Sequence, residues 1–427
     1  MNFASTDIDL AYEMDSQDEL ASYRSEFVIK DPDLIYLDGN SLGRLPKRTT
    51  DFMHAVIERE WGESLIRSWN EGWFHTPLKL GDRLAGLIGA RPDEVLVTEA
   101  TSTNLYKLSV AAVRARPGRK KIVSDVFNFP SDLYIFQGIA DLPGMQHRLT
   151  LIPSRDNLTI DFRDVQAAID EETALVSLSH VAFKSAFMYD MAKVNELAHQ
   201  VGALVLWDLS HAVGAVPVEL NAWDADMAVG CTYKYLNGGP GSPAFLYVRK
   251  DLQEELVQPI WGWFAARDPF TFNLDFNSAQ DISQFQVGTP PLLSMKALEP
   301  ALEIVAEAGI ERLRAKSVIQ TEYLIFLFDQ WLRPLGFSLG SPRQAGQRGS
   351  HVSLRHPEGY RITRALIESP PPAVKVIPDF RAPDNIRLGV APLYTTFVEI
   401  HRALERMRTI VQDEIYARYP LEKLAVT

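Results

Sequence analysis

Between about residues 94 and 249, short apolar runs alternate with segments whose apolar positions recur at helical spacing. The runs have the length of strands, and their continuous apolar character predicts burial on both faces of a largely parallel sheet. The expected strands are 94–98, 120–125, 172–180, 203–208, 227–232 and 244–249, and the expected helices are 104–115 and 190–201. This alternation predicts an α/β fold.

The pattern changes after about residue 292. Two long helical stretches, 296–308 and 311–333, lead into shorter apolar runs and a final helix at about 395–418. Such an α+β pattern predicts a second, smaller domain. The chain is therefore expected to comprise an N-terminal arm and segment that packs on the small domain (1–60), a large domain (61–295) and a small C-terminal domain (296–427).

Composition narrows the class of protein. The 427 residues are 46% hydrophobic and 23% charged, which is ordinary for a globular protein. The formal net charge is −12 and the single short basic run is RPGRKK at 116–121, so we expect no nucleic-acid partner. No apolar run reaches the roughly 18 residues of a membrane span, and the acidic N-terminus does not have the form of a signal peptide. The one cysteine, Cys231, excludes an intrachain disulfide, and we expect a cytoplasmic protein with neither a membrane nor a metal site.

Polar side chains follow the ends of five predicted strands. In an open α/β sheet, ligands bind beyond the carboxyl ends of the strands. The residues at these ends are Thr101, Ser102, Phe129, Asp132, Ser179, His180, Asp208, His211 and Lys234. We therefore expect one sheet edge to carry a lysine, two acids, an aromatic ring and small hydroxyls.

The stretch GCTYKYLNGGPG places Lys234 directly after an apolar run. A lysine in a partly desolvated pocket has a lowered pKa and can form a Schiff base with an aldehyde. Pyridoxal phosphate (PLP) needs such a lysine, and it needs an acid beside its pyridine nitrogen because a protonated ring is the better electron sink. Asp208 suits that role, and a helix start at Thr101 and Ser102 suits the phosphate. Phe129 is a candidate for one face of the ring.

Each of these signals alone has a simpler interpretation. A single lysine near a strand end is usually a surface residue, and Asp208 with His211 alone is more often a local hydrogen-bonded pair. ATSTN by itself is a helix cap, and NGGPG is a turn without the P-loop pattern. Their order along the chain and their shared sheet edge favour the cofactor site.

The motif ALVLWDLSHAVGAVPVEL, followed by VGCTYKYLNGGPGSPAF, resembles kynureninase, a PLP enzyme of the aspartate aminotransferase fold. The same resemblance is found in YLDGNSLGRLP (36–46), NFPSDLY (128–134), GWF (262–264), RGSHVSL (348–354) and IRLGVAPLYTTF (386–397). It runs from about residue 16 to 420 and looks closest to bacterial members. It implies a PLP fold type I large domain with a mostly parallel sheet and a smaller α+β C-terminal domain.

The resemblance also implies roles for individual residues. Lys234 would hold the cofactor, and Asp208 would pair with the pyridine nitrogen with Asp132 nearby. The other cofactor contacts would be Phe129 on the ring, Thr101, Ser102 and Tyr233 at the phosphate, Ser179 and His211 around it, and Trp263 and Thr289 from the second subunit of a homodimer. Arg387 would clamp the α-carboxylate of the substrate, a task that suits a planar bidentate donor.

The implied reaction is hydrolysis of L-kynurenine or 3-hydroxykynurenine to anthranilate or 3-hydroxyanthranilate and L-alanine. Lys234 would take the Cα proton, and we assign Tyr233 as the proton shuttle because it is adjacent to the lysine. Trp69 and Trp73, in SWNEGW, are candidates for an aromatic wall around the substrate ring.

The chain also departs from the family pattern. Ala265 and Ala266 follow GWF where Gly-His is usual, Ala182 replaces an Asn or His, and Ser185-Ala186 replaces Thr-Gly. A ring-modified kynurenine or another β-substituted amino acid therefore fits the same residues.

Three other functions are alternatives for this sequence. A cysteine desulfurase needs a mobile thiol, whereas Cys231 lies three residues before Lys234 in a predicted strand. A transaminase is less firmly excluded by sequence. A non-catalytic protein of this fold would be favoured by loss of the lysine or the ring-pairing acid, and both Lys234 and Asp208 are present.

Overall fold

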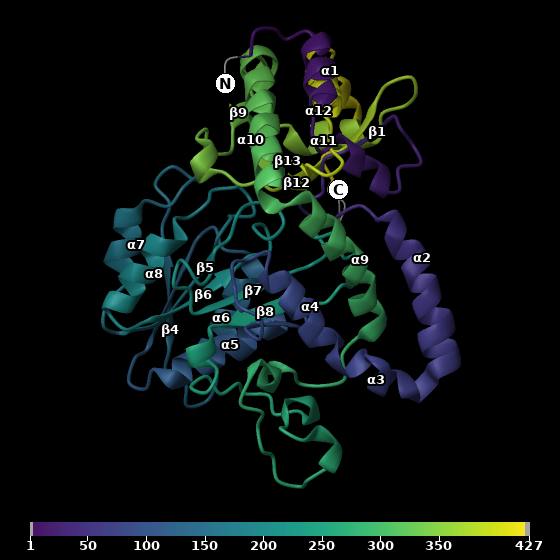
Figure 1. Cartoon of the computed structure of the whole chain (residues 1–427). Helices are drawn as coiled ribbons and strands as arrows, with labels where there is room; N and C mark the ends of the chain where they lie inside the picture. The colour runs from purple at the N-terminus through teal and green to yellow at the C-terminus, as the bar shows by residue number, and fades with distance from the viewer. Residues whose placement is uncertain (1–2, 423–427) are drawn as a thin grey trace.

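A seven-stranded sheet lies at the centre of the wider part of the molecule (Figure 1). The structure is a computed structural model that describes residues 3–422, so the outermost ends of two predicted domains, residues 1–2 and 423–427, lie outside the described residues. In spatial order the strands are β2 (Val95–Val97), β8 (Phe245–Val248), β7 (Met227–Gly230), β6 (Leu204–Asp208), β5 (Thr173–Ser179), β3 (Lys121–Asp125) and β4 (Arg148–Ile152).

The expectation of a largely parallel sheet is confirmed. Five neighbouring strands, from β7 to β4, pair in parallel, whereas β8 is antiparallel to both β7 and β2. Strand β4 was not predicted. It is an edge strand with only one buried residue, so the continuous apolar run that marks the other strands is missing from it.

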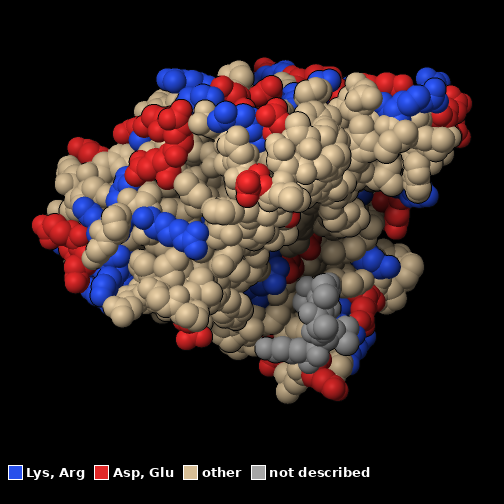
Figure 2. All heavy atoms as spheres, turned by 90° about the horizontal axis from the view of Figure 1, so that it is seen from below, with Lys and Arg blue, Asp and Glu red and all other residues tan. Residues whose placement is uncertain are grey.

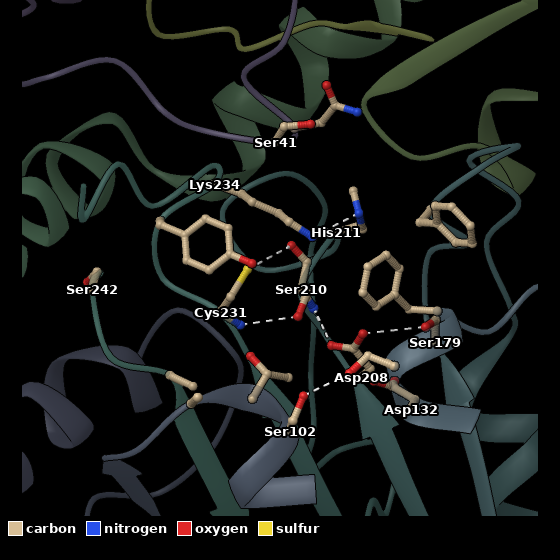
Figure 3. Close-up of a pocket in the computed structure, with 18 of the residues that line it drawn as sticks. Ser41, Ser102, Asp132, Ser179, Asp208, Ser210, His211, Cys231, Lys234 and Ser242 are labelled. Atoms are coloured by element: carbon tan, nitrogen blue, oxygen red, sulfur yellow. Dashed lines mark hydrogen bonds between the residues drawn. The ribbon is translucent and has the colours of Figure 1, made fainter. Parts of the chain in front are cut away.

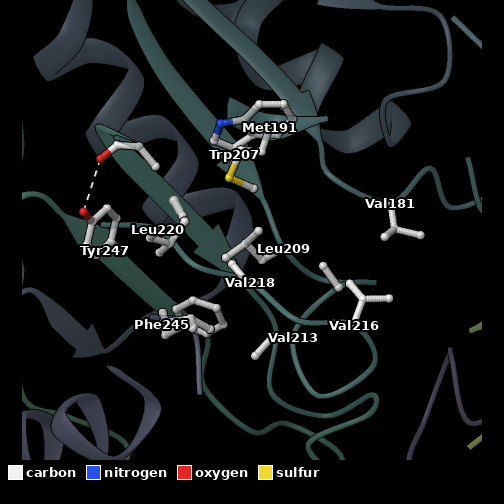
Figure 4. Packing of buried hydrophobic residues seen from close by; sticks show 14 of the residues in the cluster. Val181, Met191, Trp207, Leu209, Val213, Val216, Val218, Leu220, Phe245 and Tyr247 are labelled. Carbon is white, nitrogen blue, oxygen red and sulfur yellow. Dashed lines mark hydrogen bonds between the residues drawn. The ribbon is translucent and has the colours of Figure 1, made fainter. Parts of the chain in front are cut away.

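Alternate residues of the strands enter two separate cores, as the two-residue repeat of a strand requires. In β6, Val205 and Trp207 face one core and Leu204 and Leu206 face the other. The first core is covered by α4 (Thr76–Ala85), α8 (Met191–Gln200) and α9 (Leu292–Ala308), and Figure 4 shows Trp207 packed there near Met191. The second core is covered by α5 (Thr101–Ala115) and α6 (Pro130–Ala140). The helix α7 (Phe162–Ala168) adds Val165 to the first core.

A third core lies in the narrower part of the molecule. It is built from α10 (Ile310–Leu327), α11 (Gly359–Ile367) and α12 (Phe397–Gln412) on the four-stranded sheet β12 (Asp379–Arg381), β13 (Asn385–Gly389), β10 (His351–Arg355) and β9 (Ser338–Leu339). The predicted helices 311–333 and 395–418 both end earlier than expected as regular α-helices, at Leu327 and Gln412.

The N-terminal segment packs on this third core. Helix α1 (Ile8–Ser16) lies beside α12 (Figure 1), and β1 (Leu34–Tyr36) pairs in parallel with β11 (Lys375–Ile377). The Asp15 carboxylate accepts hydrogen bonds from the backbone N–H groups of Phe397 and Val398, at 2.8 and 3.0 Å.

Two further segments extend from the body. The helix α2 (Lys47–Ala55) continues as a π-helix (Val56–Ser64), runs beside α9 and leads to α3 (Ser68–Glu71). Residues 257–277, the projecting segment, extend below the sheet in Figure 1.

Seen from below, the molecule shows a broad uncharged area with charged residues of both signs interspersed around it (Figure 2). Within residues 3–422, no helix combines the length and apolarity needed to cross a membrane.

Candidate active site

A cavity of about 310 Å³ lies beyond the carboxyl ends of the central strands (Figure 3). Ten of the residues singled out from the sequence line it together: Thr101, Ser102, Phe129, Asp132, Ser179, Asp208, His211, Tyr233, Lys234 and Arg387. Nine of them come from the sheet edge, and Arg387 comes from β13 in the narrower part of the molecule. The cavity therefore lies between the two parts of the fold.

Lys234 points its amine at an imidazole. Its Nζ lies 2.9 Å from His211 Nε2 (Figure 3). Burial and the nearby charge of Lys234 hold the pKa of His211 well below its usual value. The imidazole is therefore neutral at pH 7, and its Nε2 accepts a hydrogen bond from the lysine. A neutral acceptor at this position directs the amine into the cavity.

Asp208 ends β6 and is buried at the cavity floor. Its Oδ1 accepts a hydrogen bond from the backbone N–H of Ser210 at 2.8 Å, and the Ser179 hydroxyl lies 3.5 Å from Oδ2. That hydroxyl donates to Asn128 Oδ1 at 2.7 Å. The carboxylate is thus fixed in orientation but retains free lone pairs for a further donor.

Asp132 lies in the first turn of α6, close to Asp208. Burial, followed by the charge of Asp208, raises the pKa of Asp132 well above its usual value. Its Oδ2 is buried and has no hydrogen-bond partner among the described residues. The raised pKa favours the protonated form, in which this unpartnered carboxyl can donate a hydrogen bond to a molecule in the cavity.

The helix α5 begins inside the site. It starts at Thr101, three residues earlier than predicted, so Thr101 and Ser102 form its first turn instead of preceding it. Ala100 at the N-cap is extended and makes no side-chain cap, which leaves backbone N–H groups of the first turn for an anion. The hydroxyl of Ser102 lies 2.9 Å from that of Ser131. This end of the cavity suits a phosphate.

Tyr233 and Cys231 lie on the wall nearest Lys234. Cys231 follows β7, which ends at Gly230, so the prediction that it lies within a strand was wrong. Its thiol is buried, and burial raises its pKa. The negative charge of an ionised Cys231, followed by burial, raises the pKa of Tyr233 above its usual value, so the phenol keeps its proton at neutral pH.

Arg387 is 1% exposed. Its Nη1 donates to the carbonyl of Phe183 at 2.6 Å, and its Nη2 donates to Ser41 Oγ at 2.9 Å. Nη2 also lies 2.5 Å from Asp379 Oδ2. Burial lowers the pKa of Arg387 from its usual value, and Asp379 is the nearest charge that opposes this effect.

Several cavity residues were not predicted. They include Asn40, Ser41, Phe183, Ser210 and Arg381. Strand periodicity could not identify them, because they lie on loops or in another sheet, up to about 340 residues from their neighbours in space. The motif YLDGNSLG contains Asn40 and Ser41, and it was the one available signal for them.

Four predicted residues lie outside the cavity wall formed by the described chain. Trp69 and Trp73 pack edge to face at 5.9 Å, and Trp69 lies 5.8 Å from the ring of Phe264. Trp263 is 41% exposed on the projecting segment, and Thr289 is also exposed. Within one chain, therefore, the aromatic wall predicted from Trp69 and Trp73 does not reach the cavity.

The departures from the family pattern fall in two places, beside the cavity residue Phe183 and in the projecting segment. Ala182 and Ala186 are buried on either side of the loop that carries Phe183. Ala186 has φ = +64°, in the left-handed region that favours glycine, so the alanine is strained there. Ser185 donates to the carbonyl of Leu158 at 2.8 Å, and Ala265 is buried in the projecting segment.

These residues fit PLP. The cavity offers an amine beside a neutral acceptor, a fixed carboxylate, a half-exposed aromatic ring in Phe129, and an uncapped helix N-terminus. The unpartnered Asp132 Oδ2 leaves one buried polar atom for the cofactor to satisfy. Each chemical group of the cofactor thus has a partner of the right kind in one cavity.

Comparison with solved structures identifies the fold. The chain aligns with the apo cysteine desulfurase of Thermococcus onnurineus NA1 at a TM-score of 0.80 and 18% identity, covering 92% of this chain and 98% of that one. A C-DES mutant with glycine covalently linked to its PLP cofactor aligns at 0.73 and 19% identity, covering 87% and 96%. Residues 35–358 match the aminotransferase class-V family, so the protein is a PLP enzyme of this class.

Sequence comparison identifies the family. The kynureninase of Pseudomonas fluorescens is 43% identical over 410 residues, 95% of each chain. That of Burkholderia mallei (strain SAVP1) is 44% identical over 411 residues, 95% of this chain and 96% of the relative. Residues 313–407 match the kynureninase C-terminal domain. The chain belongs to the kynureninase family.

Proposed function

We propose that this protein hydrolyses the Cβ–Cγ bond of L-kynurenine, or of its 3-hydroxy form, to give anthranilate or 3-hydroxyanthranilate and L-alanine. The observation that carries the proposal is the pairing of Lys234 with neutral His211 in a cavity whose other walls fit PLP. Family membership supports the choice of this reaction over others of the class.

Lys234, Asp208, Phe129 and the first turn of α5 would hold the cofactor, with Asp132, Ser179 and His211 around it. When bound, PLP supplies an electron sink for the charge that develops at Cα and Cβ of the substrate. Asp208 is fixed by the Ser210 N–H so that it can keep a proton on the pyridine nitrogen.

The chain's own groups would move the protons. The Lys234 amine would take the Cα proton, and neutral His211 would accept a hydrogen bond from it without competing as a base. Tyr233 holds its proton at neutral pH and can deliver it where the Cβ–Cγ bond breaks after water adds to the γ-carbonyl. Arg387 would bind the α-carboxylate.

A homodimer with shared active sites is part of the proposal. The projecting segment exposes large apolar side chains, including Trp261, Trp263, Phe272 and Leu274. Exposed apolar area of this kind is typical of an interaction surface. A second copy would bring Trp263 and Thr289 to the phosphate end of the cavity. A cytoplasmic location is likewise proposed.

The desulfurase alternative has little support. Its nearest thiol is buried, and burial raises the thiol pKa, so Cys231 lacks both the mobility and the thiolate character that sulfur transfer needs.

A product assay tests the proposal. Cofactor-loaded protein is mixed with L-kynurenine and, separately, with 3-hydroxy-L-kynurenine, and anthranilate or 3-hydroxyanthranilate is measured together with alanine. The Lys234→Ala variant is the control and should form neither product. Cofactor-loaded protein that cleaves neither compound would overturn the assignment and direct the search to other β-substituted amino acids.

A further inference from the structure

Two arginines share one buried carboxylate beside the cavity. Asp379 lies directly opposite Arg387 in the antiparallel pair β12–β13, and Arg381 is two residues farther along β12 on the same face. Asp379 Oδ2 lies 2.5 Å from Arg387 Nη2 and 2.9 Å from Arg381 Nε. The Asp379 side chain is 8% exposed. A carboxylate this buried is costly unless it stays paired.

The Nη2 donors of Arg387 are occupied, whereas its Nε is buried without a hydrogen-bond partner among the described residues. Nη2 carries two hydrogens, and it contacts both Ser41 Oγ and Asp379 Oδ2. Nη1 uses one hydrogen on the carbonyl of Phe183. A bidentate grip on a carboxylate needs two adjacent N–H groups of the fork. A grip that includes Nη2 is therefore possible only after Ser41 or Asp379 leaves that nitrogen.

Arg381 is placed to receive Asp379. Its side chain is 39% exposed and lines the same cavity, whereas Arg387 is 1% exposed. Arg381 already holds Asp379 through Nε, so a small rotation would add a second hydrogen bond from the same fork.

We propose that Arg381 is a positioning residue for substrate recognition. The inference rests on the proposed function only in requiring an amino-acid substrate. When the substrate α-carboxylate binds Arg387, Asp379 moves from Arg387 to Arg381. Each of the two carboxylates then binds its own guanidinium group. Without Arg381, the substrate carboxylate and Asp379 would compete for the guanidinium group of Arg387.

The test measures binding and turnover separately. Arg381→Gln in the cofactor-loaded enzyme should raise both the KM for L-kynurenine and the Kd for L-alanine, measured by calorimetry, about tenfold to a hundredfold. The kcat should change less than about threefold, because the reacting atoms are untouched. Arg381→Lys should recover part of the affinity because it retains the charge.

The decisive variant is the double substitution. Adding Asp379→Asn to Arg381→Gln removes the competing carboxylate and should restore most of the lost affinity for L-alanine. If Arg381 had a merely structural role, the losses of L-alanine affinity caused by Arg381→Gln and by Asp379→Asn would add in the double variant. Arg355→Gln is the matched control, because Arg355 pairs with Asp384 at 3.1 Å on the same sheet and is similarly exposed, at 35%. It should leave both constants unchanged.

Two results would overturn the inference: an Arg381→Gln enzyme with wild-type Kd for L-alanine, or a double variant that binds no better than Arg381→Gln alone. Failure of the proposed function is a different result. In that case the wild-type enzyme would not cleave kynurenine, while L-alanine binding would still depend on Arg381 and Asp379 as described.

Discussion

At the residue scale, the two carboxyls at the cavity floor have different tasks. Asp208 accepts a hydrogen bond from a backbone N–H and is available to a positive donor, whereas burial raises the pKa of Asp132 and so favours its protonated form. Neighbouring carboxyls whose environments separate their pKa values are typical of active sites. The sequence placed both acids at one sheet edge, but it could not say which would be protonated, because that depends on burial.

This difference predicts unequal effects of the same substitution. Asp132→Asn imitates the protonated form that burial favours and should lower kcat by less than about tenfold, whereas Asp208→Asn should lower it by about a hundredfold or more. Steady-state kinetics with L-kynurenine at pH 8 measure both. Equal losses would show that Asp132 acts as a carboxylate.

Asp125, at the end of β3, should make stability depend on pH. Burial raises its pKa to about 6, although its carboxylate accepts hydrogen bonds from Tyr189 and Phe127. The unfolded value is about 3.9. Between about pH 4 and pH 6 the folded state therefore binds more protons than the unfolded state. The free energy of unfolding falls by about 2–3 kcal/mol as the pH rises through this range, and it stays at the lower value above about pH 6.

Urea unfolding at pH 5 and pH 7.5 checks this. The wild-type protein should lose about 1.4 kcal/mol more than Asp125→Asn between the two pH values, because the amide does not titrate. An identical pH dependence in the two proteins would contradict the assignment.

At the element scale, the sequence predicted the buried strands, a largely parallel sheet and the helices α5 and α8, but not α6, α7 or the antiparallel direction of β8. β8 looks like its neighbours in sequence because burial on both faces produces the same apolar run in either direction. The start of α5 was placed three residues late because Thr101 and Ser102 look like caps. They are first-turn residues whose free N–H groups belong to the site. This assignment requires the three-dimensional structure of the cavity.

The helix α12 should depend on α1 for part of its stability. Thr396 and Glu399 form a capping box, and Asp15 supplies a second cap from another element. Asp15→Ala should lower the free energy of unfolding by about 1–2 kcal/mol, because two N–H groups lose a carboxylate partner at the positive end of the helix. Urea denaturation measures the loss. Asp9 lies in α1, like Asp15, but is exposed. Asp9→Ala is therefore the control and should change the free energy of unfolding by much less.

At the scale of the whole molecule, the expected shared site makes a sharp prediction. Lys234→Ala and Trp263→Ala should each be nearly inactive alone. If Trp263 completes the site of a second copy, a mixed dimer contains one site with both residues intact. When equal amounts of the two variants have exchanged subunits to equilibrium, the mixture should regain about a quarter of wild-type activity. About half of the dimers are then mixed, and one of the two sites in each mixed dimer is active.

Mixing at concentrations from nanomolar to micromolar checks the prediction. The recovered activity should grow with time as subunits exchange. If the activity of the mixture never exceeds the summed activities of the two separate variants, Lys234 and Trp263 act within one chain, or Trp263 does not act at the site.

The N-terminal segment gives the molecule a fixed order of assembly. Strand β1 pairs with β11, about 340 residues later in the chain, and the Gly43 N–H donates to the carbonyl of Tyr233 at 2.8 Å. During synthesis the sheet and its lysine are complete before β11, Asp379 and Arg387 leave the ribosome. A nascent chain can therefore form the floor of the cavity while its first forty residues still lack their partners. If Arg387 binds the substrate carboxylate as proposed, substrate recognition has to wait until the chain has been made to beyond β13.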